Sequence, residues 1–148
     1  MAIRHESTLT KEQIENNRQW LMKLRSGNFK QGKFNLKSLP SNGEVEYCCL
    51  GVACVGLVDF PFTGKSTSAV TFLHLNESDF YLSEDVKRKL GLLNRDGAAE
   101  YSICAQRSVS LTRLNDQEDN TFAEIADEIE LSLKESAGIA FDWSTVNE

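Results

Sequence analysis

The chain has 148 residues, of which 41% are hydrophobic and 26% are charged, and its formal net charge is −6. This length suits one globular domain, and this composition excludes a disordered tail protein, a collagen-like repeat and a coiled coil. The longest uncharged apolar run, Cys48–Val58, falls well short of the ~20 residues of a membrane helix, and residues 1–10 lack the apolar core of a signal peptide. We therefore expect one cytoplasmic domain over residues 1–148, with residues 1–9 as an N-terminal extension and residues 139–148 as a C-terminal tail.

The charge is distributed unevenly along the chain. Residues 1–37 hold eight Lys and Arg against three acids, whereas residues 38–148 carry a net charge of −11. Proteins that bind duplex nucleic acid need a broad basic face, so we expect no such partner. The basic segment can meet a small anion or an acidic protein surface; the alternative is that opposite charges pair within the fold.

The first predicted element is a helix over Lys11–Ser26. Thr10 and Gln13 have the spacing of a capping box, apolar residues follow at helical spacing, and Gly27 is a typical stop. The segment Asn28–Glu46 is rich in turn residues and is predicted to be a loop.

The next element is an apolar segment with several small residues, Tyr47–Val58. Its periodicity does not separate a buried strand from a buried helix. We predict a central buried helix, because the segment is long for a strand and its small residues permit close packing.

The rest of the chain is predicted to contain short strands and two further helices. The strands are expected at Ala69–Leu75, Glu100–Cys104 and Ser108–Leu111, the last two as a hairpin. The helices are expected at Glu84–Leu90 and Phe122–Glu135, with one helical turn at Leu111–Asn115. Thr121 and Glu124 form a second capping box, and Phe141 and Trp143 are expected to dock the tail. The predicted fold is α+β: three to four helices around a small antiparallel sheet of about three strands.

The four cysteines are Cys48, Cys49, Cys54 and Cys104. Without a secretion signal we expect reduced thiols, and their spacing lacks the paired knuckles of a zinc site. Packed thiols are the main interpretation. The alternative is a nucleophile, Cys49 or Cys48, at the positive end of the central helix, with His74 as its base and Asn115 or Asp116 as the third member.

Two other motifs are incomplete. The segment Gly64–Thr67 resembles the end of a phosphate-binding loop, but Asp59 stands where the first glycine is needed. Acids from Asp116 to Asp127 follow a calcium-loop template, but Thr121 replaces the glycine of its sharp turn. We therefore predict neither a metal nor a cofactor.

Several segments taken together resemble a known family. They are Trp20–Gly32, the Tyr-Cys-Cys-Leu-Gly-Val motif with its third cysteine over Tyr47–Cys54, Leu82–Leu92, Leu111–Asp116 and Phe122–Ile129. In this order they resemble a family of small, largely uncharacterised proteins encoded by bacteriophages and prophages. The resemblance implies phage infection as the context and carries over no catalytic residues.

The function expected from this context is non-catalytic binding in the host cytoplasm, either blocking a host protein or sequestering a small anionic molecule. The expected binding residues are polar groups near the start of the central helix: Lys30, Gln31, Lys33, Tyr47, Cys49, Asn115 and Asp116. Lys30, Gln31 and Lys33 are expected to face outward. The alternatives are a small cysteine-dependent enzyme and a decoy that presents the acidic surface Asp116–Glu130.

Overall fold

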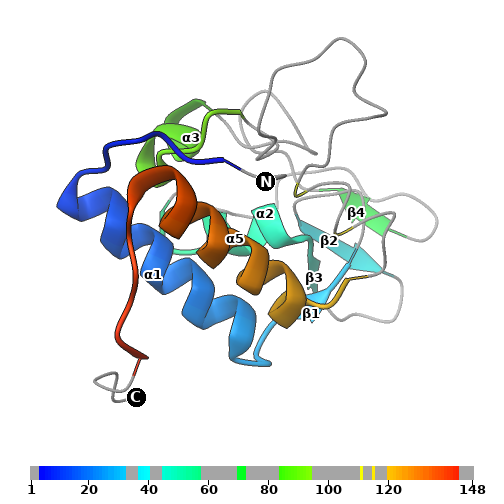
Figure 1. Ribbon diagram of the computed structural model, residues 1–148. Helices are drawn as coiled ribbons and strands as arrows, with labels where there is room; N and C mark the ends of the chain where they lie inside the picture. Colours follow the sequence, from blue (N-terminus) through cyan, green and yellow to red (C-terminus); the bar gives the residue numbers. More distant parts are fainter. Residues whose placement is uncertain are drawn as a thin grey trace, which may run out of the picture.

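The computed structural model describes residues 4–32, 37–40, 45–57, 70–72, 84–94, 111, 115 and 120–143, with the backbone alone for 37–40 and 70–72. Within these ranges the chain forms four helices and a four-stranded sheet (Figure 1). The two long helices, α1 (Lys11–Arg25) and α5 (Phe122–Ala137), pack side by side in antiparallel directions. The mixed helix-and-strand class and the number of helices are as predicted.

The sequence specifies both long helices at their ends. Thr10 accepts the backbone N–H of Gln13, and Thr121 accepts that of Glu124, so both predicted capping boxes are confirmed. Helix α5 ends at Gly138, whose backbone is left-handed with φ of 69°. The helices bury their apolar faces against each other and the core, which accounts for their amphipathic spacing.

Helix α2 (Cys49–Cys54) lies behind this pair, and all six of its residues are buried. The predicted central buried helix is confirmed, but its predicted extent over Tyr47–Val58 is wrong. Tyr47 is recruited into a strand, and Val55 after the helix has extended backbone with ψ of 118°. Strand pairing with distant segments thus shortens the helix from its N-terminal end.

The sheet consists of β1 (Lys30–Gln31), β2 (Lys37–Pro40), β3 (Glu46–Tyr47) and β4 (Val70–Phe72), in the order β1-β3-β2-β4. Strand β1 is parallel to β3, whereas β2 is antiparallel to both β3 and β4.

This sheet corrects two predictions. The segment Asn28–Glu46 is not a loop throughout, because it contains β1, β2 and the first residue of β3, and the sheet is mixed and four-stranded rather than three-stranded and antiparallel. Strands this short carry no alternating pattern, so only their pairing partners define them. Strand β4 confirms the centre of the strand predicted at Ala69–Leu75. The predicted hairpin of Glu100–Cys104 and Ser108–Leu111 lies outside the described residues, apart from Leu111, whose backbone is helical like that of Asn115.

Helix α3 (Glu84–Leu90) has the predicted bounds. The segment before α1 packs beside the C-terminal end of α3. The backbone N–H of Glu6 donates to Gly91 O at 2.8 Å, and His5 forms a β-bridge with Leu92. Part of the expected N-terminal extension is therefore integrated into the fold, with His5 only 1% exposed. No helix among the described residues is long and apolar enough to cross a membrane.

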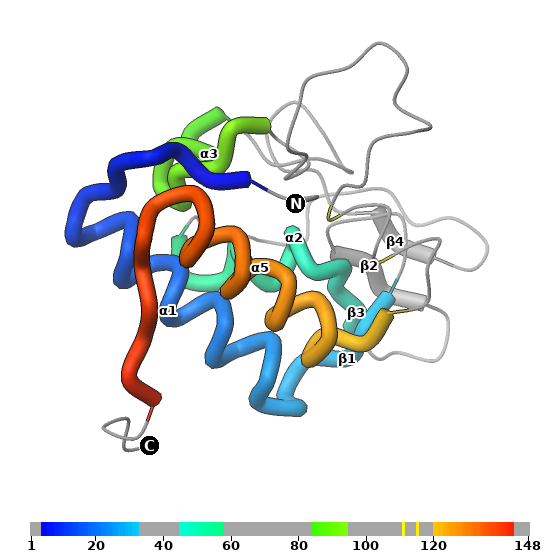
Figure 2. The backbone as a smooth tube through the Cα atoms, in the orientation of Figure 1, coloured from blue at the N-terminus to red at the C-terminus, as the bar shows by residue number. Residues whose placement is uncertain are grey.

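After α5 the chain turns back along α1 (Figure 2). Ile139, Phe141 and Trp143 are partly buried against the hydrophobic core. The expected docking of the tail through Phe141 and Trp143 is confirmed, and this segment forms one wall of the open surface described below.

Candidate functional site

Three of the predicted binding residues converge on one internal point. The Oδ1 atom of Asn115 accepts the Nε2–H of Gln31 at 3.0 Å and the backbone N–H of Cys49 at 3.1 Å. Its Nδ2 atom donates to Gly32 O at 2.8 Å. Both Asn115 and Cys49 are fully buried. The predicted grouping of Gln31, Cys49 and Asn115 is therefore present, and their polar atoms bond to one another inside the protein, where they join β1 to the start of α2.

The remaining predicted binding residues lie around this network. Lys30 is exposed and pairs with Glu46 at 3.6 Å, whereas Gln31 also donates to Asn120 O at 2.8 Å and thus points inward, contrary to prediction. Tyr47 is half-buried and meets the Phe29 ring edge-on at 5.4 Å, and burial raises the pKa of its phenol. Lys33 and Asp116 lie outside the described residues.

The thiols of the cysteine hypothesis are enclosed. Cys48, Cys49 and Cys54 have exposed fractions of 4% or less, and Cys49 Sγ lies 3.4 Å from Leu111 O. Burial raises the pKa of the Cys54 thiol, and the neighbouring Cys48 raises it further. A nucleophile needs a lowered pKa and access to substrate. His74, Asp116 and Cys104 lie outside the described residues, and the described part of the chain holds no cluster of three or more metal-binding side chains.

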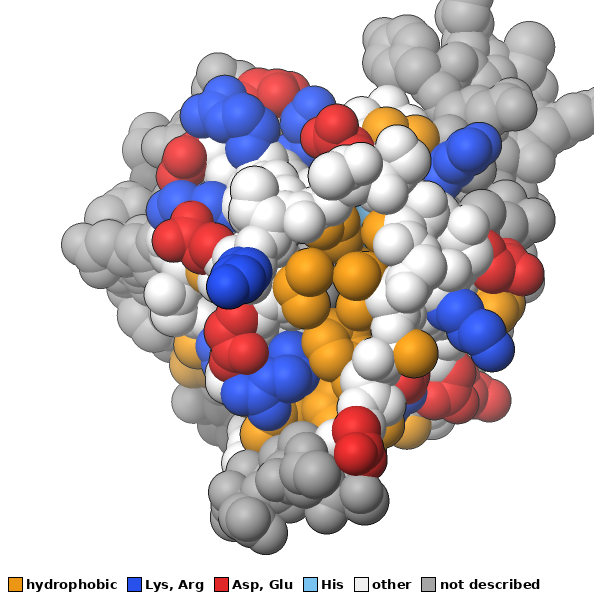
Figure 3. All heavy atoms as spheres, turned by 60° about the vertical axis from the view of Figure 1, so that its left-hand side comes forward, with side chains coloured by type: hydrophobic (Ala, Val, Ile, Leu, Met, Phe, Trp, Pro, Cys, Tyr) orange, Lys and Arg blue, Asp and Glu red, His pale blue; other side chains and the backbone are white. Residues whose placement is uncertain are grey.

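An open groove runs between the end of α1, the segment after it, α5 and the tail. It encloses about 780 Å³, and we call it the α1–α5 groove. Met22, Phe29 and Trp143 supply apolar walls. Its charged side chains are Lys23, Arg25, Asp127 and Glu130. Figure 3 shows hydrophobic side chains exposed on the face where α1 and the tail come forward, bordered by charged groups of both signs.

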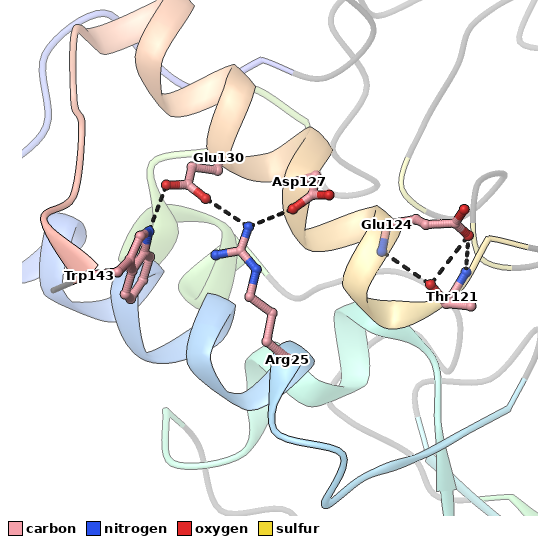
Figure 4. Close-up of polar contacts among 6 residues, drawn as sticks. All are labelled: Arg25, Thr121, Glu124, Asp127, Glu130 and Trp143. Carbon is pink, nitrogen blue, oxygen red and sulfur yellow. Dashed lines mark hydrogen bonds and ion pairs between the residues drawn. The ribbon is translucent and has the colours of Figure 1, made fainter. Parts of the chain in front are cut away.

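Arg25 organises the charged side of this groove (Figure 4). Its Nη2 atom donates to Asp127 Oδ1 at 2.8 Å and to Glu130 Oε1 at 2.7 Å. Glu130 Oε2 accepts the Trp143 indole N–H at 2.8 Å, and the guanidinium carbon lies 5.5 Å from the Trp143 ring centre. Burial alone would lower the pKa of Arg25, but its hydrogen bonds to the two carboxylates raise it, so this group is a fixed cation.

Sequence reasoning missed this groove. The sequence indicates only tail docking for Trp143, and it places Asp127 and Glu130 only on the acidic surface Asp116–Glu130, because the segments that form the groove are more than 100 residues apart. The one available signal was the excess of basic residues over positions 1–37, which contains Lys23 and Arg25.

A second polar cluster was also missed, at the buried side of the N-terminal segment. His5 Nδ1 lies 2.8 Å from Ser132 Oγ, and His5 Nε2 lies 2.9 Å from Asn17 Oδ1. The amide nitrogen of Asn17 donates to Gln13 O and Leu90 O, so its Oδ1 is the acceptor and His5 Nε2 carries the proton. Nδ1 then accepts the Ser132 hydroxyl.

These residue types match a hydrolytic Ser–His–Asn arrangement, but their burial excludes substrate. His5 is 1% exposed, and Asn17 and Ser132 are fully buried. Burial lowers the pKa of His5 to about 4, and the hydrogen bond to Asn17 opposes this shift. His5 is therefore neutral at pH 7 and joins the N-terminal segment to α1 and α5.

Comparison with known proteins adds a family. The family model described as Domain of unknown function (DUF8296) matches residues 11–133, a span that contains Arg25, Asp127 and Glu130 but ends before Trp143. No curated protein and no solved structure matches the sequence. Since the matched span covers most of its length, this chain belongs to the Domain of unknown function (DUF8296) family.

Proposed function

We propose that this chain is a non-catalytic binding protein that sequesters a small anionic molecule in the α1–α5 groove. The observation that carries the proposal is the pairing of an open apolar surface with a guanidinium held in place by two carboxylates. Small-molecule sites typically combine apolar walls with a few fixed polar groups, over volumes of roughly 300–1,000 Å³. The groove, at about 780 Å³, has this character.

The chemistry of the groove favours binding over catalysis. Among its described lining residues the one hydroxyl is that of Ser26, which donates to Lys23 O at 2.8 Å, and none of these lining residues is a histidine. The described thiols, those of Cys48, Cys49 and Cys54, lie in the core rather than in the groove. An activated nucleophile requires a neighbouring base within hydrogen-bonding reach.

The resemblance to phage proteins supplies the proposed setting. A small protein that holds a host metabolite tightly lowers its free concentration in the infected cytoplasm by mass action. Blocking of a host protein through the same groove is the competing function, and the experiment below distinguishes the two.

The test is native mass spectrometry of the chain, purified gently from bacterial cells before and during phage infection. We expect an added mass of a few hundred daltons that is lost in Gln19→Trp, because Gln19 is exposed on α1 and lines the groove. Glu12→Trp is the matched control, since Glu12 is exposed on the same helix outside the groove lining. An added mass of protein size that Gln19→Trp removes would favour the blocking function. A bare chain under both conditions would contradict sequestration.

A further inference from the structure

Resting on the proposed binding function, we propose that the ligand of the α1–α5 groove is a monocarboxylate on an aromatic or aliphatic body. Arg25 receives its carboxylate, Lys23 adds a second positive charge to the groove lining, and Met22, Phe29 and Trp143 contact its body. The hydrogen-bond donors that the fold leaves unused determine which ligand charge the groove selects.

Arg25 has more donors than the protein uses. Both N–H groups of Nη2 are taken by Asp127 and Glu130, whereas the Nε–H and the two N–H groups of Nη1 have no acceptor among the described residues. The terminal nitrogen without a dashed contact in Figure 4 lies on the side of Trp143. The Arg25 side chain is 30% exposed, so these donors are partly withdrawn from water yet reachable from the groove.

Lys23 adds a second cation two residues earlier on α1. Its Nζ atom donates to Val55 O at 2.5 Å, which leaves two ammonium N–H groups without an acceptor among the described residues. Burial lowers its pKa, so an anion bound nearby would favour the charged form. Lys23 therefore adds positive potential to the groove, whereas the unused donors of Arg25 mark the place for an acceptor group.

The carboxylates of the groove limit how much negative charge the ligand can carry. Asp127 and Glu130 balance Lys23 and Arg25, so a dianionic phosphate would meet two nearby negative charges while only two positive charges attract it. A single carboxylate can accept hydrogen bonds from the unused donors of Arg25 and is repelled less strongly by Asp127 and Glu130. The Asp127 side chain is 74% exposed, so its repulsion is screened by water but not abolished.

The experiment measures the affinity of the intact chain for four probes that share a naphthyl body. They are 2-naphthylacetate, 2-naphthylethanol, 2-naphthylethylamine and 2-naphthyl phosphate, with dissociation constants taken from saturation-transfer NMR and calorimetry. We expect 2-naphthylacetate to bind at least about fivefold more tightly than the other three, as expected for one partly desolvated charge contact.

Three variants assign this preference to the named residues. Arg25→Gln should weaken the binding of 2-naphthylacetate by about tenfold, with little change for the neutral alcohol. Lys11→Gln, which removes an exposed positive charge from the same helix outside the groove lining, should change neither affinity. Asp127→Asn should increase the affinity for 2-naphthylacetate by about threefold, because it removes a repulsive charge and releases Arg25 from an ionic contact. A purely structural role of these residues does not predict a gain in affinity.

The outcomes separate the inference from the function on which it rests. If all probes bind equally, or if the amine or the phosphate binds best, the charge inference is overturned while groove binding stands. If no probe binds at millimolar concentration, or if Gln19→Trp does not reduce binding, both the inference and the proposed small-molecule function are overturned.

Discussion

The side chain of Asn115 and the backbone N–H of Cys49 are 66 residues apart in sequence and form a 3.1 Å hydrogen bond in the core. This bond satisfies the first N–H of α2. The N-cap residue, Cys48, makes no side-chain cap hydrogen bond. Asn115 thus acts as the cap that the local sequence does not provide.

We expect Asn115→Ala to lower the free energy of unfolding by about 2–4 kcal/mol, because it leaves the buried N–H of Cys49 and the C=O of Gly32 without this partner. Gln31→Ala, at the half-buried rim of the same network, should cost about 1 kcal/mol. Urea unfolding followed by circular dichroism measures both.

The same variants test the binding site expected from sequence. If Gln31→Ala stays folded and keeps the wild-type affinity for the groove ligand, this network is structural. A loss of affinity at unchanged stability would restore Gln31 as a binding residue.

Stability should depend on pH through His5. Its pKa is lowered from 6.5 to about 4 in the folded protein, so the unfolded chain takes up a proton at a higher pH than the folded one. The stability contribution is therefore fully present above pH 6.5 and is lost as the pH falls toward 4, by about 3 kcal/mol.

The control for this prediction is His5→Gln, measured by urea unfolding at half-unit steps from pH 7.5 to 4. The variant should be less stable at pH 7, because it disturbs the bonds to Asn17 and Ser132, but its pH dependence should be flatter. The difference between the wild-type and variant curves of unfolding free energy against pH removes the contribution of the carboxylates, because they titrate in both proteins. Parallel curves would show that His5 is not the group responsible.

The buried thiols should be unreactive in the folded chain. A Cys104→Ser background removes the cysteine outside the described residues, so iodoacetamide labelling then reports Cys48, Cys49 and Cys54 alone. At pH 7 we expect labelling at least about a hundredfold slower than that of the same protein in denaturant, since the thiols are buried and burial raises the pKa of Cys54. Rapid native labelling of Cys48 or Cys49, resolved by peptide mass spectrometry, would support the cysteine-enzyme alternative.

Two left-handed glycines provide a matched pair for backbone strain. A Cβ added to Gly138 meets no atom within 4 Å, so Gly138→Ala should cost only the strain of its positive φ, about 1 kcal/mol. Alanine at Gly91 has the same backbone strain, and its Cβ would also collide with the Leu9 side chain. Gly91→Ala should therefore lower the free energy of unfolding by about 2 kcal/mol or more.

Thermal unfolding of both variants measures this difference. In the double variant Leu9→Ala/Gly91→Ala the collision is removed. Its loss of stability should therefore be smaller than the sum of the losses in the two single variants. Equal costs for the two single glycine variants would mean that Leu9 moves aside without penalty.

The sequence by itself determined the two long helices, with both capping boxes and the glycine that ends α5, because these signals act within one or two turns of the same helix. It also determined the core position of α2 and the grouping of Gln31, Cys49 and Asn115 near its start.

Only the tertiary structure decided what these residues face. Pairing of short strands shortened α2 and turned a predicted loop into most of a sheet, and contacts across 102 and 105 residues joined Arg25 to the carboxylates of α5. The physical reason is that a groove or a buried network depends on which segments pack together, and that choice is made by burial over the whole chain rather than by local spacing.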